Sequence, residues 1–148
     1  MERDKIYIGS RSSKLALIYA EKVKTEIEKY FNGEISIIKI STSGDKNLHT
    51  RLSEIGGKGL FSSSIEKELL NEKIDIAVHA LKDLPSFETH GLTTNCFLKR
   101  NSPNEVMISN SQKKLEELVP GSIIGTSSFR REFQLKRKRK DLNFKLIR

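Results

Sequence analysis

The chain has 148 residues, of which 36% are hydrophobic and 31% are charged, and its formal net charge is +8 at pH 7. It has no apolar run long enough for a transmembrane helix and no apolar signal-peptide core near its start, and its single cysteine excludes an internal disulfide. These features predict a soluble cytoplasmic protein that can bury a hydrophobic core.

The positive charge is concentrated near the C-terminal end of the chain. Residues 130–148 hold nine Lys or Arg against two acidic residues, a net charge of +7, whereas the rest of the chain carries only +1. This asymmetry indicates an anionic partner: nucleic acid, a membrane surface or a polyanionic small molecule.

The first elements form a predicted β-α-β unit. Lys5–Gly9 is a predicted strand, and Ser12 or Ser13 can cap a helix that runs to about Phe31. The Ile-rich segment Glu34–Ser41 follows as a second strand. This order favours a parallel pair of strands with a right-handed crossover.

A long, glycine-rich segment, Thr42–Leu60, comes next, and loops of this length are usually functional. Phe61–Asn71 is a predicted helix. Ile74–Ala80 is a predicted strand, apolar enough to be central in a sheet, and Gly91–Leu98 is a further strand. The predicted inward positions of the helix are Ile65, Leu69 and Leu70.

A polar segment with a proline, Arg100–Asn104, is a predicted hinge between two domains. Residues 7–17 and 122–135 share one plan of apolar strand, Gly, hydroxyl residues, Arg and helix, which indicates two similar domains that face each other. The elements predicted after the hinge are a strand Glu105–Ser109, a short helix Lys113–Leu118, a strand Ser122–Gly125, a helix to about Lys140 and a strand Leu142–Ile147.

Each strand–Gly–hydroxyl–helix junction is a candidate anion site, because the first N–H groups of a helix lack backbone partners and its dipole is positive there. Helix capping alone explains any single serine, whereas anion binding is favoured for the TSSxRR motif as a unit. The candidate ligands are Arg11 and Ser13 at the first junction, and Thr126, Ser127, Ser128, Arg130 and Arg131 at the second.

The stretch AVHALKDLP ends an apolar strand with the charged pair Lys82 and Asp83. The pair is either a weak surface ion pair or a functional pair at the carboxyl edge of the sheet, where α/β proteins bind ligands. We favour the second interpretation, with an ionised Asp83 that holds a ligand N–H and stabilises positive charge. His79 and Cys96 are predicted core residues, and no histidine has metal-site spacing.

The sequence does not establish a function for two further motifs, GGKG and KRKRK. The GGKG segment places Lys58 on a flexible backbone but lacks P-loop spacing, so a carboxylate contact and a solvated turn are equally compatible with it. The KRKRK run at 136–140 has no interleaved aromatic residues, which favours a solvated helix face over a nucleic-acid patch.

Together these motifs resemble the porphobilinogen deaminase (hydroxymethylbilane synthase) family. The matching pieces, which span the chain in the family's order, are IGSRSSKLAL, GGKGLF, AVHALKDLP, PNEV and PGSIIGTSSFRREFQL. The resemblance implies a transferase of porphyrin and heme biosynthesis that joins four porphobilinogen units into hydroxymethylbilane and releases ammonia each time. It also implies a dipyrromethane cofactor on which the polypyrrole intermediates grow, and an active site between two periplasmic-binding-protein-like α/β domains.

The resemblance assigns roles to the matching residues. Asp83 would be catalytic, because loss of ammonia from porphobilinogen leaves a cationic azafulvene-like species that a carboxylate stabilises. The acetate and propionate groups of the pyrroles would be bound by Arg11, Ser13, Lys58, Lys82, Thr126, Ser127, Ser128, Arg130, Arg131 and Arg148, the last matching the Arg of the family's R-G-N segment.

The chain also departs from the family pattern. Ala80 stands where a Ser is usual, and Glu54 stands where a Lys is common. By resemblance, residues 1–99 are most of domain 1, 100–104 the hinge and 105–148 the first half of domain 2, while domain 3 and its cofactor-bearing Cys are absent. The expectation is an N-terminal portion that is inactive alone and that a separate C-terminal chain could complete. The alternatives are a non-catalytic carboxylate-binding module of periplasmic-binding type and a nucleic-acid binder.

Overall fold

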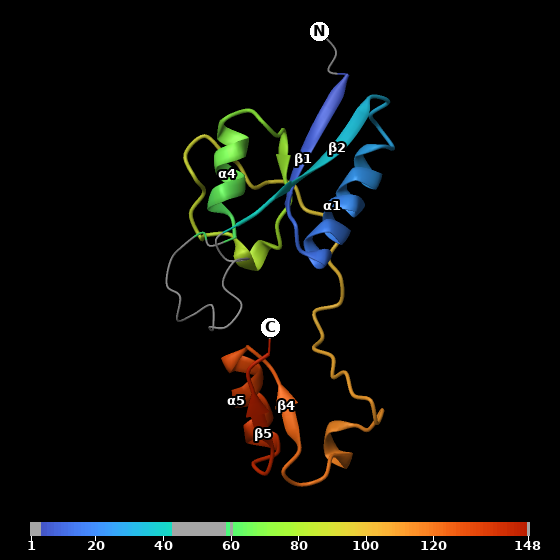
Figure 1. Ribbon diagram of the computed structural model, residues 1–148, viewed down its shortest axis with the longest axis vertical. Coiled ribbons are helices and arrows are strands. Elements are labelled where there is room, and N and C mark those ends of the chain that lie inside the picture. Colours follow the sequence, from blue (N-terminus) through green and yellow to red (C-terminus); the bar gives the residue numbers. More distant parts are fainter. Residues whose placement is uncertain (1–3, 43–58, 60, 148) are drawn as a thin grey trace. The chain divides into compact units, whose positions relative to one another are not determined.

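The computed structural model describes residues 4–42, 59 and 61–147. The chain divides into two compact units, and the division falls between Leu98 and Lys99. Unit 1 holds the described residues up to Leu98, and unit 2 holds those from Lys99 onward (Figure 1).

Unit 1 is built on a parallel sheet with the strand order β2-β1-β3. Its described strands are β1 (Lys5–Arg11), β2 (Glu34–Ile40) and β3 (Ile76–Ala77), and its described α-helices are α1 (Lys14–Ile27) and α4 (Ser63–Leu70). The strands β2 and β3 flank β1 on opposite sides, so right-handed crossovers place α1 and α4 on opposite faces of the sheet. Figure 1 shows the two helices on either side of β1. The mixed α/β class expected from the sequence is confirmed.

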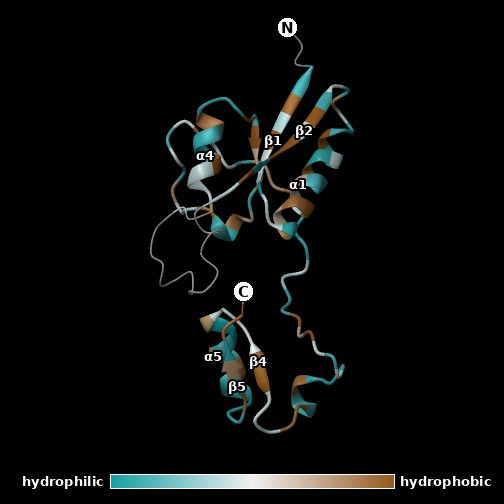
Figure 2. Ribbon diagram, viewed as in Figure 1, coloured by the Kyte–Doolittle hydropathy of each residue, from teal (hydrophilic) through white to brown (hydrophobic). Residues whose placement is uncertain are grey.

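The core of unit 1 lies on both faces of β1. Ile8 packs with Ala20 of α1 and Ile35 of β2, and all three are buried. Ile74 packs against β1 at Gly9, where a Cβ would lie 2.2 Å from the Ile74 Cδ1 atom. A larger residue at position 9 would therefore force the Ile74 side chain to move. The hydrophobic positions in β1 and β2 are the brown segments of Figure 2.

Unit 2 repeats the β-α-β pattern on a smaller scale. A two-stranded parallel sheet pairs β4 (Ile123–Gly125) with β5 (Asn143–Lys145), and α5 (Phe129–Lys138) connects the strands. A short 3₁₀ helix, η2 (Leu115–Glu117), precedes them. Among its described residues, few apolar side chains are buried: Leu142 is, whereas Ile123, Phe129 and Phe133 are exposed.

Several predicted elements differ from the structure. The strand β3 is short and lies at the edge of the described sheet, so the central position expected for Ile74–Ala80 is wrong, and β1 is the central strand. Neither Gly91–Leu98 nor Glu105–Ser109 forms a strand. A strand needs a neighbour for its N–H and C=O groups, and no such partner is present among the described residues. The segment Lys113–Leu118 forms only the 3₁₀ helix η2.

Arg139 holds the end of η2 in place, although the sequence assigned it to a solvated basic run. Its guanidinium donates to the carbonyl oxygens of Leu115 (2.8 Å), Glu116 (3.2 Å) and Leu118 (2.9 Å). It also forms a two-point pair with the Asp141 carboxylate, at 2.8 and 2.6 Å. A planar guanidinium is suited to this because its donors point in several fixed directions.

We expect Arg139→Lys to lower the thermal midpoint of unit 2, because an ammonium group cannot reach three carbonyls and a carboxylate together. Arg137→Lys, an equal change in the exposed part of α5, is the control and should leave the midpoint unchanged. The measurement is the loss of protection of unit 2 amides in hydrogen exchange on heating. Equal behaviour of the two variants would contradict the structural role of Arg139.

The two faces of α4 provide a test of the core. Ile65 is fully buried, whereas Leu70 is 48% exposed, which corrects the inward position expected for Leu70. Ile65→Ala should lower the free energy of unfolding by about 2–5 kcal/mol, and Leu70→Ala by much less. Tyrosine fluorescence in urea reports unit 1 selectively, since the chain has no Trp and its three Tyr all lie there. A similar loss in both variants would show that α4 packs through a different face.

Candidate functional site

The carboxyl edge of the unit 1 sheet brings two predicted site residues together. Arg11 is the last residue of β1, and Asp83 lies in the 3₁₀ helix η1 (Leu81–Asp83), shortly after β3. Because β1 and β3 are adjacent and parallel, their carboxyl ends lie at the same edge. The Arg11 Nη1 atom is 4.0 Å from the Asp83 Oδ2 atom, and both side chains are about four-fifths buried, with 21% and 24% exposed. This is a loose ion pair rather than a close hydrogen bond.

Phe61 supports Arg11, a role that the sequence did not reveal. The Arg11 guanidinium carbon lies 3.9 Å from the centroid of the Phe61 ring, and the ring is buried. A cation over an aromatic face is stabilised by the ring quadrupole, and the stacked guanidinium keeps its N–H groups at its edge. Phe61 is the last residue of the GGKGLF motif, and its place in that motif was the only indication in the sequence that it has a role.

The other predicted residues of unit 1 contribute differently. Ser13 caps α1, and its Oγ atom accepts a hydrogen bond from the Ala16 N–H at 3.4 Å, so the capping interpretation holds for it. Lys82 is exposed in η1, next to Asp83. Lys58 and Arg148 lie outside the described residues, as does Glu54.

His79 lies mostly buried beside this edge, in agreement with the packed position expected for it. Its Nε2 atom is buried and has no hydrogen-bond partner among the residues that the structure describes. Burial lowers the pKa of His79 below its ordinary value of 6.5, and the nearby Arg11 lowers it further, while Glu66 and Asp83 act in the opposite direction. The imidazole is therefore neutral at pH 7.

The start of α5 in unit 2 gathers the predicted residues of the second junction. Thr126 Oγ1 accepts from the Ser128 N–H at 3.1 Å, and Ser128 Oγ accepts from the Arg131 N–H at 3.4 Å. These hydroxyl groups thus order the turn and cap the helix. Ser127 is exposed, and Arg130 and Arg131 project from the first turn of α5.

Both arginines form ion pairs with Glu105, a residue that the sequence did not single out. Arg130 Nη2 pairs with Glu105 Oε1, and Arg131 Nε lies 2.7 Å from Glu105 Oε2. Hydrogen bonds from Arg130 and then Arg131 lower the pKa of the Glu105 carboxyl below its ordinary value. Glu105 is the Glu of the PNEV segment, and the sequence alone indicated no role for this residue.

Arg11 beside Asp83 in unit 1, and Arg130 with Arg131 around Glu105 in unit 2, are cations that can attract anionic groups, and Asp83 can accept from an N–H donor. Comparison with known proteins shows which family the chain belongs to. The family model described as "Porphobilinogen deaminase, dipyromethane cofactor binding domain" matches residues 6–148. The chain belongs to the porphobilinogen deaminase family.

Individual relatives agree with the porphobilinogen deaminase family model. A porphobilinogen deaminase of Wolbachia sp. subsp. Drosophila simulans (strain wRi) is 47% identical over 144 residues, which cover 97% of this chain and 49% of that protein. The Bacillus subtilis (strain 168) porphobilinogen deaminase is 46% identical over 147 residues, which cover 97% of this chain and 46% of that protein. The chain spans about half the length of the curated relatives it matches.

The donor set suits the cofactor named in the porphobilinogen deaminase family model. A dipyrromethane with carboxylate side chains needs cations for those groups and an acceptor for its pyrrole N–H groups. Among the described residues, unit 1 holds a cation in Arg11 and an acceptor in Asp83, and unit 2 holds the cations Arg130 and Arg131. Within each unit, the described residues are therefore of the types that this group requires.

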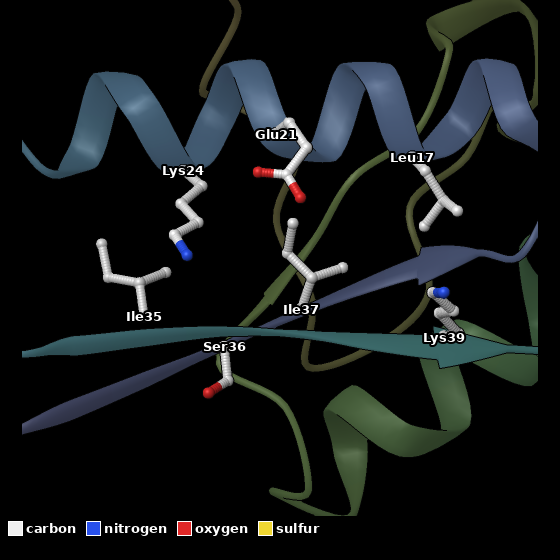
Figure 3. A pocket seen from close by; sticks show the side chains of 7 residues that line it. All are labelled: Leu17, Glu21, Lys24, Ile35, Ser36, Ile37 and Lys39. Atoms are coloured by element: carbon white, nitrogen blue, oxygen red, sulfur yellow. The ribbon is translucent and has the colours of Figure 1, made fainter.

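An open groove of about 440 Å³ lies between α1 and β2 (Figure 3), and none of the predicted site residues lines it. Its walls are Leu17, Glu21, Lys24, Ile35, Ser36, Ile37 and Lys39. Within the described residues, no cluster of three or more His, Cys, Asp or Glu is placed to hold a metal. None of the described helices is long and apolar enough to span a membrane.

The buried His79 predicts a pH dependence of stability. The unfolded chain takes up a proton at the histidine below about pH 6.5, whereas folded His79 does so only at lower pH. The free energy of unfolding should therefore fall as the pH drops from about 7.5 to 5.5, a range above the ordinary pKa of carboxyl groups. His79→Gln should remove this slope in urea unfolding followed by tyrosine fluorescence.

The exposed His90 provides the control. His90→Gln should keep the slope of the original chain. An unchanged slope in His79→Gln would show that His79 is protonated equally in the folded and unfolded states.

Proposed function

We propose that the chain provides substrate-binding and catalytic groups for hydroxymethylbilane synthesis, the condensation of four porphobilinogen molecules with release of ammonia. The observation that carries this proposal is the pairing of Arg11 with Asp83 at the carboxyl edge of the unit 1 sheet, where both residues match the family motifs. In this proposal unit 1 is the first domain of a periplasmic-binding-like fold, unit 2 is part of the second, and the protein is cytoplasmic.

The chemistry requires opposite charges in one place. Porphobilinogen carries an acetate and a propionate, so it needs cationic residues, and its loss of ammonia creates positive charge on the pyrrole. Asp83 accepts the pyrrole N–H and stabilises that charge, while Arg11 and Lys82 bind carboxylates. The partial burial of Asp83 strengthens this stabilisation, because the local dielectric is lower than in water.

Unit 2 provides carboxylate-binding groups of its own, namely Thr126, Ser127, Ser128, Arg130 and Arg131. Two arginines in the first turn of a helix are unfavourable for the helix dipole, which favours anions there. Glu105 offsets part of this cost, and a ligand with carboxylates would offset more of it. The dipyrromethane cofactor, when bound, supplies the pyrrole on which the product grows.

The test is Asp83→Asn in the chain combined with the second half of the Bacillus subtilis relative. The amide keeps the size of the side chain but cannot stabilise a cation, so porphobilinogen consumption should fall at least about a hundredfold. Binding of porphobilinogen should weaken far less. Asp4→Asn, at an exposed position of unit 1, is the matched control and should retain activity.

Near-normal consumption in Asp83→Asn would remove Asp83 from the chemistry. Porphobilinogen binding without ammonia release by every combination of chains would instead support a non-catalytic carboxylate-binding module.

A further inference from the structure

The carboxylate of Glu105 lies between two consecutive arginines of α5. Each of its oxygens takes one guanidinium: Oε1 pairs with Arg130 Nη2, and Oε2 lies 2.7 Å from Arg131 Nε. Glu105 belongs to a segment without regular secondary structure and is 25 residues from Arg130. This contact therefore joins that segment to the first turn of α5.

Neighbouring residues on a helix do not face the same way without a cause. Consecutive side chains project about 100° apart around the axis, and two guanidinium groups repel each other. A shared carboxylate overcomes both effects and holds the two groups together. Arg130 is held from a second direction, since its Nη1 atom donates to Gln134 Oε1 at 3.3 Å.

The three side chains still attract anions. Two guanidinium groups against one carboxylate leave a net positive charge, which the positive end of the α5 dipole increases. Arg131 meets Glu105 through Nε, and a guanidinium has further N–H donors on its other edges. A ligand carboxylate can therefore bind to the arginines while Glu105 keeps its contacts.

The contact contributes little to folding stability. The side chains of Glu105, Arg130 and Arg131 are 44%, 61% and 49% exposed, and exposed ion pairs are weak in water. Its effect lies in the order that it gives to two flexible side chains. Arginines that are already ordered lose less conformational freedom when a ligand binds.

We propose that Glu105 is a positioning residue that holds Arg130 and Arg131 side by side for the carboxylate groups of the ligand. This inference rests on the proposed function, because it requires the two arginines to bind carboxylates.

The first experiment tests the positioning without any ligand. In the full chain, the Arg131 Nε–Hε signal in nitrogen-15 NMR should show slow solvent exchange at pH 7. Glu105→Gln should accelerate that exchange, and Glu105→Asp should restore part of the protection. Glu116→Gln removes an equal charge from an exposed site in unit 2 and should change nothing. Fast exchange in the unaltered chain would overturn the proposal.

The second experiment measures porphobilinogen binding to the same variants by calorimetry. Glu105→Gln should weaken binding roughly three- to tenfold, the effect expected from one or two side chains that must be ordered on binding. Glu105→Asp should recover most of the affinity, and Glu116→Gln should retain all of it. Thermal melts of the variants should coincide, which separates positioning from folding.

The outcomes separate this inference from the proposed function. Glu105→Gln could bind porphobilinogen as tightly as the unaltered chain or more tightly, while the binding still depends on Arg130 and Arg131. That result would overturn only the positioning role of Glu105 and would show that its carboxylate competes with the ligand for the arginines. If porphobilinogen does not bind, or binds equally well to the Arg130→Ala/Arg131→Ala variant, the carboxylate-binding role of the arginines fails and the inference fails with it.

Discussion

The parallel pairing of β1 with β3 is the interaction on which the unit 1 site depends. The register places Gly9 opposite Ala77, and two backbone hydrogen bonds, from Asp75 N–H to Tyr7 and from Val78 N–H to Gly9, fix it. The Asp75 carboxylate adds a third contact by accepting from the Tyr7 N–H at 2.8 Å. A shift of one residue would exchange the faces of the strand and separate Arg11 from Asp83. A ladder only two residues long is thus fixed by contacts at its two ends.

Arg139, Arg11, Arg130 and Arg131 differ in the kind of contact that the structure gives them. Arg139 contacts three carbonyls and a carboxylate, so its guanidinium is committed to the fold. Arg11 stacks on the Phe61 ring and forms a loose ion pair with Asp83 at the sheet edge. Arg130 and Arg131 share one carboxylate. Composition alone presents all four as members of a basic chain, and only the contacts distinguish them.

The sequence was sufficient where the signal is local. The β-α-β order, a serine cap at the start of each helix and the position of Asp83 after a strand follow from patterns within a few residues, although the choice of Ser13 over Ser12 does not. Phe61, Glu105 and Arg139 were missed because the arginines that the first two contact, and the carbonyl groups that Arg139 contacts, lie about 20 to 50 residues away, a distance at which no spacing rule applies. The strands expected at 91–98 and 105–109 failed for a related reason. Strand propensity measures how well a residue fits in a sheet. It does not predict whether a neighbouring strand is present to pair with it.

The two units use one local plan but place their cations differently. In both, a strand and a serine cap lead into a helix, and the cap accepts from the N–H three residues later at 3.4 Å. Arg11 precedes its cap, so it belongs to the sheet and is fixed by the pairing of β1 and by a buried ring. Arg130 and Arg131 follow their cap, so they belong to a helix turn whose geometry separates them and whose dipole disfavours them. A counter-charge from outside the helix is therefore needed in unit 2, and Glu105 provides it.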